Sequence, residues 1–160
     1  MTVQIRPAEA RDLEFIVRGN AAMALETEHK QLDPPTLRRG VQSAFEDAGR
    51  ARYFVAEIDG QVVGQMMLTD EWSDWRNAVF WWIQSVYVLP QARRQGVFRA
   101  LYVHVEQLAR ATPGVCGLRL YVENDNIRAQ RTYLGCGMVD AGYRVMETDY
   151  SGASKHAGEH

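Results

Sequence analysis

The stretch Leu89–Leu101 reads L-P-Q-A-R-R-Q-G-V-F-R-A-L and predicts how the chain folds around an anion. An apolar strand ends at a proline, and a basic turn that contains a glycine then opens a helix. The first N–H groups of a helix have no backbone partner and its dipole is positive at that end, so the backbone after Arg93 and Arg94 can bind a pyrophosphate. Gly96 lets the backbone approach such a ligand closely.

A strand, a glycine turn and a helix also describe an ordinary βα connection, and a second motif distinguishes the two. The segment Leu120–Met138 reads L-Y-V-E-N-D-N-I-R-A-Q-R-T-Y-L-G-C-G-M, with Asn126, Ala129 and Tyr133 at i, i+3 and i+7. The two segments, in this order and about thirty residues apart, resemble the motifs of the GNAT superfamily of N-acetyltransferases.

This resemblance implies a site for acetyl-coenzyme A (acetyl-CoA). In the family, R-x-x-G-x-(G/A) wraps the pyrophosphate; Phe98 departs from that pattern, so its side chain must point away from the ligand. The family's asparagine contacts the cofactor arm, and the strand before the loop splays from the next parallel strand to admit the pantetheine. The implied cofactor-binding residues are Val86, Tyr87, Val88, Arg93, Arg94, Gln95, Gly96, Val97, Phe98, Arg99, Asn126, Ala129 and Tyr133.

Composition limits the class of protein. The 160 residues suit one domain, and 46% hydrophobic and 24% charged residues are ordinary for a soluble globular protein. The net charge of −2 gives no global positive field to bind nucleic acid, whereas Arg93, Arg94 and Arg99 make a local basic cluster suited to one small anion.

No apolar run reaches membrane-spanning length and no signal sequence opens the chain, so we expect no membrane partner and a cytoplasmic location. Cys116 and Cys136 lack metal-ligand spacing, so we expect no metal.

The pattern of apolar residues predicts the element order β-α-α-β-β-β-α-β-α-β, which agrees with an α/β (α+β) GNAT fold: a central mixed, mostly antiparallel sheet flanked by helices. Residues 3–150 would form a single GNAT domain and 151–160 a flexible tail. Asp59-Gly60 predicts a tight hairpin, Asp70–Asn77 a polar loop, and Val139–Asp149 a final strand interrupted at Gly142.

The family implies roles for two kinds of group. The main chain of Val86–Val88 would bind the cofactor, with one of its amides as the oxyanion donor. Tyr133 would be the general acid, because an unperturbed phenol with a pKa of about 10 is protonated at neutral pH. Without the family, a buried aromatic would be the simpler interpretation of Tyr133. Asn126 could also cap a helix, which is compatible with contacting the cofactor.

The general base and the acceptor site are less defined. Many relatives place a glutamate on the central strand, but this chain has Gln84 at that position, and an amide cannot accept the proton. Glu26 and Glu28, at the end of the first helix, lie where the family forms its acceptor pocket and are the candidate bases. The less favoured carboxylates are Glu71, Glu123 and Glu147; ordinary solvated side chains are the alternative for all five. Trp72 and Trp75, beside carboxylates, could bind a cationic amine by face contact. The candidate substrate-binding residues are Glu26, Glu28, Trp72, Trp75 and Gln84.

The leading hypothesis is an acetyl-CoA-dependent N-acetyltransferase that acts on a primary amine of a small molecule, by direct attack in a ternary complex. A peptide or protein acceptor is an alternative. A non-catalytic acyl-CoA-binding module is another, which the missing strand glutamate would permit. A nucleotide-binding protein is disfavoured, because the chain has neither G-x-x-x-x-G-K-(S/T) nor G-x-G-x-x-G. Relatives commonly dimerise, so the resemblance allows a homodimer.

Overall fold

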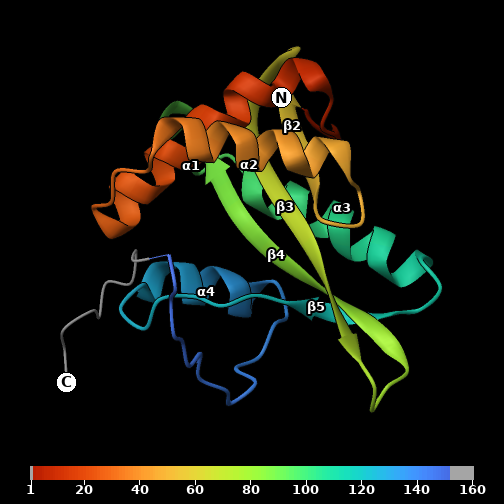
Figure 1. Ribbon diagram of the computed structural model, residues 1–160. Coiled ribbons are helices and arrows are strands. Elements are labelled where there is room, and N and C mark those ends of the chain that lie inside the picture. Colours follow the sequence, from red (N-terminus) through yellow and green to blue (C-terminus); the bar gives the residue numbers. More distant parts are fainter. Residues whose placement is uncertain (1, 152–160) are drawn as a thin grey trace. The chain divides into compact units, whose positions relative to one another are not determined.

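The computed structural model describes residues 2–151, which form two compact units that adjoin in sequence at Leu120 and Tyr121. The first unit contains a five-stranded sheet whose neighbours follow chain order (Figure 1): β1 (Val3–Pro7), β2 (Arg52–Ile58), β3 (Gln61–Ser73), β4 (Ala78–Val88) and β5 (Val115–Arg119). The first four strands pair antiparallel, and β5 pairs parallel with β4. The predicted α/β fold with a mixed, mostly antiparallel sheet is therefore confirmed.

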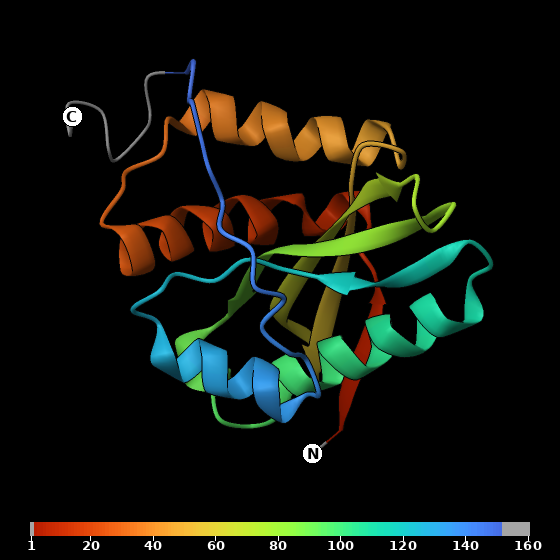
Figure 2. The same cartoon turned by 90° about the horizontal axis from the view of Figure 1, so that it is seen from below.

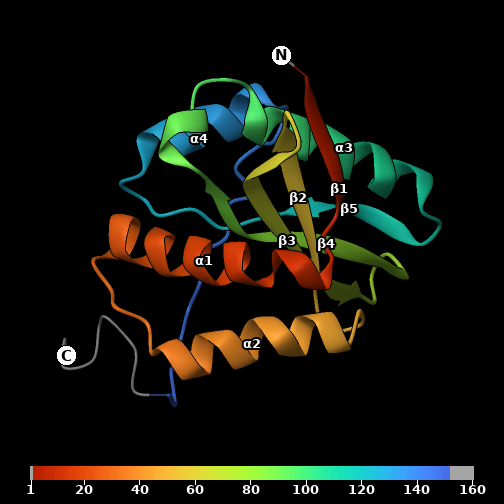
Figure 3. The same ribbon diagram turned by 90° about the horizontal axis from the view of Figure 1, so that it is seen from above.

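Helices cover both faces of this sheet. On one face, α1 (Leu13–Glu28) and α2 (Pro34–Glu46) run side by side (Figure 3). On the other face lies α3 (Val97–Ala111) (Figure 2). Short 3-10 turns, Ala10–Asp12 and Pro90–Ala92, precede α1 and α3. The second unit contains one helix, α4 (Ile127–Gly135).

Local sequence signals set several of these boundaries. Asp33 caps α2, because its side chain accepts a hydrogen bond from the Thr36 N–H at 3.2 Å, and Pro34 opens the helix with a φ that suits its first turn. Between β2 and β3, Asp59 and Gly60 both have positive φ, 51° and 77°. That is the conformation of the tight hairpin predicted at these two residues.

Alternate side chains of the central strands fill two hydrophobic layers. Toward α1 and α2, Tyr53 and Val55 of β2 join Ile16 and Val41 in one cluster. Toward α3, Phe54 packs against His104, with ring centroids 5.6 Å apart. Burial of one such large side chain contributes about 1.5–3 kcal/mol, so these layers fix the helices on the strands that carry the site.

Two predicted segments differ from the structure. The polar loop Asp70–Asn77 is shorter than expected, because β3 continues to Ser73 and pairs with the start of β4. The predicted final strand, Val139–Asp149, is irregular: no ladder partner pairs with it among the described residues, and Gly142 turns the chain with a φ of 79°. Apart from Ser151, the predicted tail lies outside the described residues.

Gly64 connects the sheet to the start of α3 and gives a test of this packing. A Cβ at Gly64 would lie 2.9 Å from the Val97 Cγ1 and 3.4 Å from the Tyr87 carbonyl oxygen. We expect Gly64→Ala to lower the free energy of unfolding by about 1–3 kcal/mol, measured by urea denaturation. Gly40→Ala is the control, because a Cβ there meets nothing within 4 Å. In the exposed middle of α2 it should raise stability by about 0.5–1 kcal/mol, and equal effects of the two changes would contradict the packing argument.

Candidate functional site

The first unit leaves one edge of β4 unpaired. The parallel ladder between β4 and β5 runs from Val79 to Trp82 on β4, and β5 ends at Arg119. From Ile83 to Val88, β4 pairs with β3 alone. Because backbone N–H and C=O groups need partners, this free edge can take up an extended ligand that carries amide groups.

A β-bulge interrupts β4 at the start of this free edge. Gln65 pairs with Tyr87 and Met67 with Gln84, so Ser85 and Val86 together oppose the single residue Met66. Ser85 has a φ of 50°, which a non-glycine residue adopts at a cost. Bulges change the direction of a strand and commonly occur beside functional sites.

Beyond the bulge, the backbone N–H and C=O groups of the three residues predicted to bind the cofactor face different ways. The Leu89 N–H donates to the Val63 carbonyl at 2.8 Å. Since backbone directions alternate along a strand, the groups of Tyr87 also face β3, whereas those of Val88 face away from it. Val86 lies in the bulge and has no partner in the register. Val86 and Val88 are thus the residues whose backbone amides are available to a ligand at the free edge.

The turn after β4 has the geometry predicted for an anion cradle. Arg94 and Gly96 both adopt positive φ, 63° and 78°, and a Cβ at Gly96 would meet nothing within 4 Å. The first α-helical bond of α3 runs from the Ala100 N–H to the Gly96 carbonyl at 3.0 Å, so the N–H groups of the preceding turn have no acceptor within the helix. Phe98 packs beside Tyr102, one turn further along α3, with centroids 6.2 Å apart.

The three predicted arginines of the cradle have different surroundings. Arg93 donates to the Val88 carbonyl at 2.9 Å and to Glu26 at 2.8 Å, and its guanidinium stacks over the Tyr87 ring at 5.5 Å. Its side chain therefore joins the end of β4 to the end of α1. Arg94 and Arg99 are exposed and make no hydrogen bond or ion pair with any described residue. These two cations are available to a phosphate.

The predicted carboxylates are mostly engaged. Glu26 binds Arg93 and accepts a long hydrogen bond from the Tyr87 hydroxyl at 3.4 Å. Burial and the charge of Glu26 raise the pKa of Tyr87. Glu71 pairs with Arg119 at 2.7 Å. Glu28, the last residue of α1, is exposed and makes no ion pair within the described chain.

Gln84 and Trp72 lie on different faces of the sheet. Gln84 pairs with Met67 and donates to the Thr69 hydroxyl at 2.7 Å, whereas Trp72 pairs with Val79. Met67 and Trp72 are five residues apart on β3, so their side chains face opposite ways. The structure thus does not bring Trp72 together with Gln84, and Trp75 is 88% exposed in the turn beyond.

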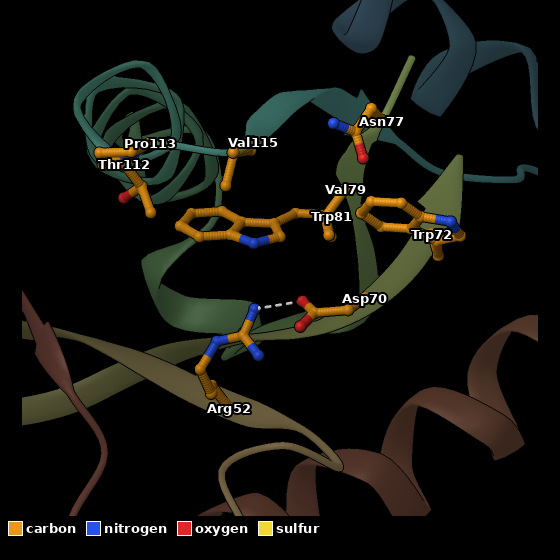
Figure 4. Close-up of a pocket in the computed structure, with 10 residues that line it drawn as sticks. Arg52, Asp70, Trp72, Asn77, Val79, Trp81, Thr112, Pro113 and Val115 are labelled. Carbon is orange, nitrogen blue, oxygen red and sulfur yellow. Dashed lines mark hydrogen bonds and ion pairs between the residues drawn. The ribbon is translucent and has the colours of Figure 1, made fainter. Parts of the chain in front are cut away.

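Trp72 instead lines an open pocket of about 390 Å³ on the α3 side of the sheet, shown in Figure 4. There Arg52 pairs with Asp70 at 2.8 Å and stacks over the Trp81 ring at 5.2 Å. Trp81 is only 7% exposed and belongs to the core. The two charges in this pocket satisfy each other, so nothing in it points to a ligand.

The second unit holds the other predicted motif. The Asn126 side chain caps α4 by accepting a hydrogen bond from the Ala129 N–H at 3.1 Å. Tyr133 is half-buried on the same helix, and burial together with the neighbouring Cys136 raises its pKa. Both cysteines are free thiols. Among residues 2–151, no group of three or more His, Cys, Asp and Glu side chains could hold a metal ion, and no helix is long and apolar enough to span a membrane.

Sequence reasoning missed a buried polar pair in the first unit. Gln65 and Asn20 are 0% and 6% exposed and hydrogen-bond to each other at 2.8 Å. The signal was a glutamine inside the apolar run V-V-G-Q-M-M-L of β3. A polar residue at a core position of a strand needs a partner or a function.

Comparisons with known proteins agree with this geometry. The model of the Acetyltransferase (GNAT) family matches residues 21–138. The chain belongs to this family. The match crosses from the first unit into the second, as the prediction of one domain over residues 3–150 would require, although that boundary stays a prediction. No curated protein matches the sequence.

Solved structures with the same fold include proteins named as acetyltransferases. A possible acetyltransferase from Clostridium difficile 630 is 40% identical, with a TM-score of 0.86 over 93% of this chain and 98% of that one. AAC(6')-Iy, in complex with the bisubstrate analogue CoA-S-monomethyl-acetylneamine, is 15% identical, with a TM-score of 0.73 over 93% of this chain and 99% of that one. A ribosomal-protein-alanine N-acetyltransferase from Brucella melitensis biovar Abortus 2308 is 17% identical, with a TM-score of 0.75 over 93% of this chain and 99% of that one. The latter two show the fold alone.

Family membership supports acyl transfer from acetyl-CoA, and the residues of this GNAT chain fit that cofactor. The left-handed turn at Gly96 leaves open space beside the first N–H groups of α3. Arg94 and Arg99 supply uncommitted positive charge for phosphates. The free edge of β4 leads directly into this turn, so an anion and an amide-bearing chain attached to it could bind side by side.

Arg94 provides a test of the cradle. We expect Arg94→Ala to weaken CoA binding by roughly tenfold, measured by calorimetry, because a charge-assisted hydrogen bond to phosphate is lost. The effect should shrink as salt rises. Arg110→Ala is the matched control, since Arg110 is 78% exposed near the other end of α3. Unchanged affinity in Arg94→Ala, or equal losses in both variants, would contradict the cradle.

Proposed function

We propose that this chain is an N-acetyltransferase that moves the acetyl group of acetyl-CoA to a primary amine of a small molecule, by direct attack in a ternary complex in the cytoplasm. One observation carries the proposal: the unpaired edge at the end of β4 is followed along the chain by the basic turn at Gly96, which opens α3. The cofactor supplies an acetyl group activated as a thioester.

The main chain would perform most of the binding. The first N–H groups of α3, with Arg94 and Arg99, would hold the phosphates. The amide groups of Val86 and Val88 would pair with the extended arm and with the thioester carbonyl. An N–H group held on a rigid strand at that carbonyl stabilises negative charge as it develops there, without reorganisation.

Two carboxylates of the chain are candidates to accept the proton of the amine. Gln84 has no basic atom, and Glu71 is paired with Arg119. Glu28 is uncommitted among the described residues, and Glu26 already binds Arg93. We assign proton acceptance to Glu28 or Glu26, through water, and attraction of a cationic amine to the same carboxylates.

The amine's chemical class has some support from neighbours of the same fold. AAC(6')-Iy was solved with an analogue that joins CoA to an acetylneamine, and the Brucella protein is named for a ribosomal-protein alanine. A small amine or a peptide amine is therefore within the range of this fold. Gln84, in place of a strand glutamate, favours a second function, an acyl-CoA-binding module without turnover.

Binding and transfer are tested in that order. We expect calorimetric titration of the purified protein to give saturable binding of acetyl-CoA and none of ATP or NAD. A panel of small amines and short peptides, assayed by release of the CoA thiol, should then give acceptor-dependent turnover. Binding without turnover on any amine would favour the acyl-CoA-binding module, and absence of binding would refute the proposal.

Tyr133 is the proposed proton donor to the departing sulfur. We expect Tyr133→Phe to lower kcat by about 100-fold while the acetyl-CoA affinity changes less than twofold. Tyr143→Phe, 78% exposed in the same unit, is the control and should match the unmodified protein. Because burial raises the pKa of Tyr133, its phenol stays protonated at neutral pH, and loss of this acid should lower kcat only above about pH 10. Unchanged kcat in Tyr133→Phe would remove it from the mechanism.

A further inference from the structure

A buried amide contacts the bulge of β4 from the neighbouring strand. The Gln65 side chain is fully buried, and its Nε2 donates to the Ser85 carbonyl at 3.0 Å and to the Asn20 Oδ1 at 2.8 Å. Asn20 belongs to α1. A polar chain therefore runs from the helix layer through the core to the bulge.

The orientation of this amide follows from its partners. A backbone carbonyl only accepts hydrogen bonds, so the Gln65 atom that faces Ser85 must be the nitrogen. The Gln65 Oε1 then has no hydrogen-bond partner among the described residues. It lies against α1 where Gly19 has no side chain; a Cβ there would be 2.5 Å away. An apolar side chain of similar size would avoid this unsatisfied acceptor, so the amide is retained for its nitrogen.

What the nitrogen holds is the Ser85–Val86 peptide unit. A trans peptide is planar, so the Ser85 C=O and the Val86 N–H point in opposite directions and turn together. With the carbonyl bound to Gln65, the Val86 N–H is directed away from Gln65. The φ of 50° at Ser85 is unfavourable for a serine, so this orientation needs a support that a regular strand would not.

We infer that Gln65 is a positioning residue, which aims the Val86 N–H at the thioester carbonyl of acetyl-CoA by holding the Ser85 carbonyl. The inference rests on the proposed function. It assigns a role in the acyl site to a side chain that cannot touch the cofactor, and a supporting role to Asn20, which fixes the Gln65 amide from α1.

The test compares two probes that use different parts of the site. Adenosine 3',5'-bisphosphate reaches only the cradle, whereas acetyl-CoA also reaches β4. We expect Gln65→Met, which keeps the side-chain volume but donates no hydrogen bond, to weaken acetyl-CoA binding by roughly fivefold to tenfold. The affinity for the bisphosphate should change less than twofold. Leu68→Met is the control, as another fully buried residue of β3, and should leave both affinities unchanged.

Each outcome separates the inference from the proposed function. Equal loss of both affinities in Gln65→Met, or no loss in a folded variant, would overturn the positioning role. Failure of the unmodified protein to bind acetyl-CoA would refute the proposed function itself. If Gln65→Met does not fold, Gln65→Asn keeps an amide that is too short to reach both Ser85 and Asn20, and the same selective loss for acetyl-CoA is expected of it.

Discussion

The site depends on where the pairing between β4 and β5 ends. β4 is bonded on both edges only as far as Trp82, and from there one row of its N–H and C=O groups is open. Such a row is a hazard in most proteins, since it can pair with any extended chain. Here β4 turns at the Ser85 bulge, and after Val88 the chain passes through the 3-10 turn Pro90–Ala92 to the Gly96 turn that opens α3. In the proposed function, the property that makes an edge hazardous would let it receive an extended ligand with an anion at one end.

Arg93 is a motif residue whose side chain is committed to partners within the protein. The family pattern begins at this arginine, yet its guanidinium donates to the Val88 carbonyl and to Glu26. It thereby fixes the end of β4, whose direction determines which amides face outward, and it neutralises a carboxylate at the end of α1. An arginine serves this purpose better than a lysine, because its planar group can bond to two acceptors and stack on Tyr87 at the same time.

The helices and several turns could be predicted because they follow from local rules, whereas the arrangement of the sheet was implied by the family resemblance; the cradle stays a prediction. Periodicity placed the helices, and Asp59-Gly60 and Gly96 marked turns that require positive φ. The predictions that were wrong concern contacts between residues far apart in the sequence. Asp70–Ser73 looks like a loop by composition but is held in β3 by cross-strand pairing, and Val139–Asp149 has β-forming residues without a partner strand. Trp72 and Gln84 were both candidates for the acceptor site, and only the register shows that they lie on opposite faces of the sheet.

The buried Gln65 illustrates how stability and function oppose each other in this core. Around it the layers are apolar and close-packed, with Ile16, Val55 and Met66 fully buried. At this one position a strand interior contains an amide with an unsatisfied oxygen, and α1 must have a glycine to admit it. A sequence selected for stability alone would replace this arrangement with a hydrophobic side chain. Local rules are broken beside Ser85, a strand residue with a left-handed backbone conformation, and such violations are expected at functional or strained sites.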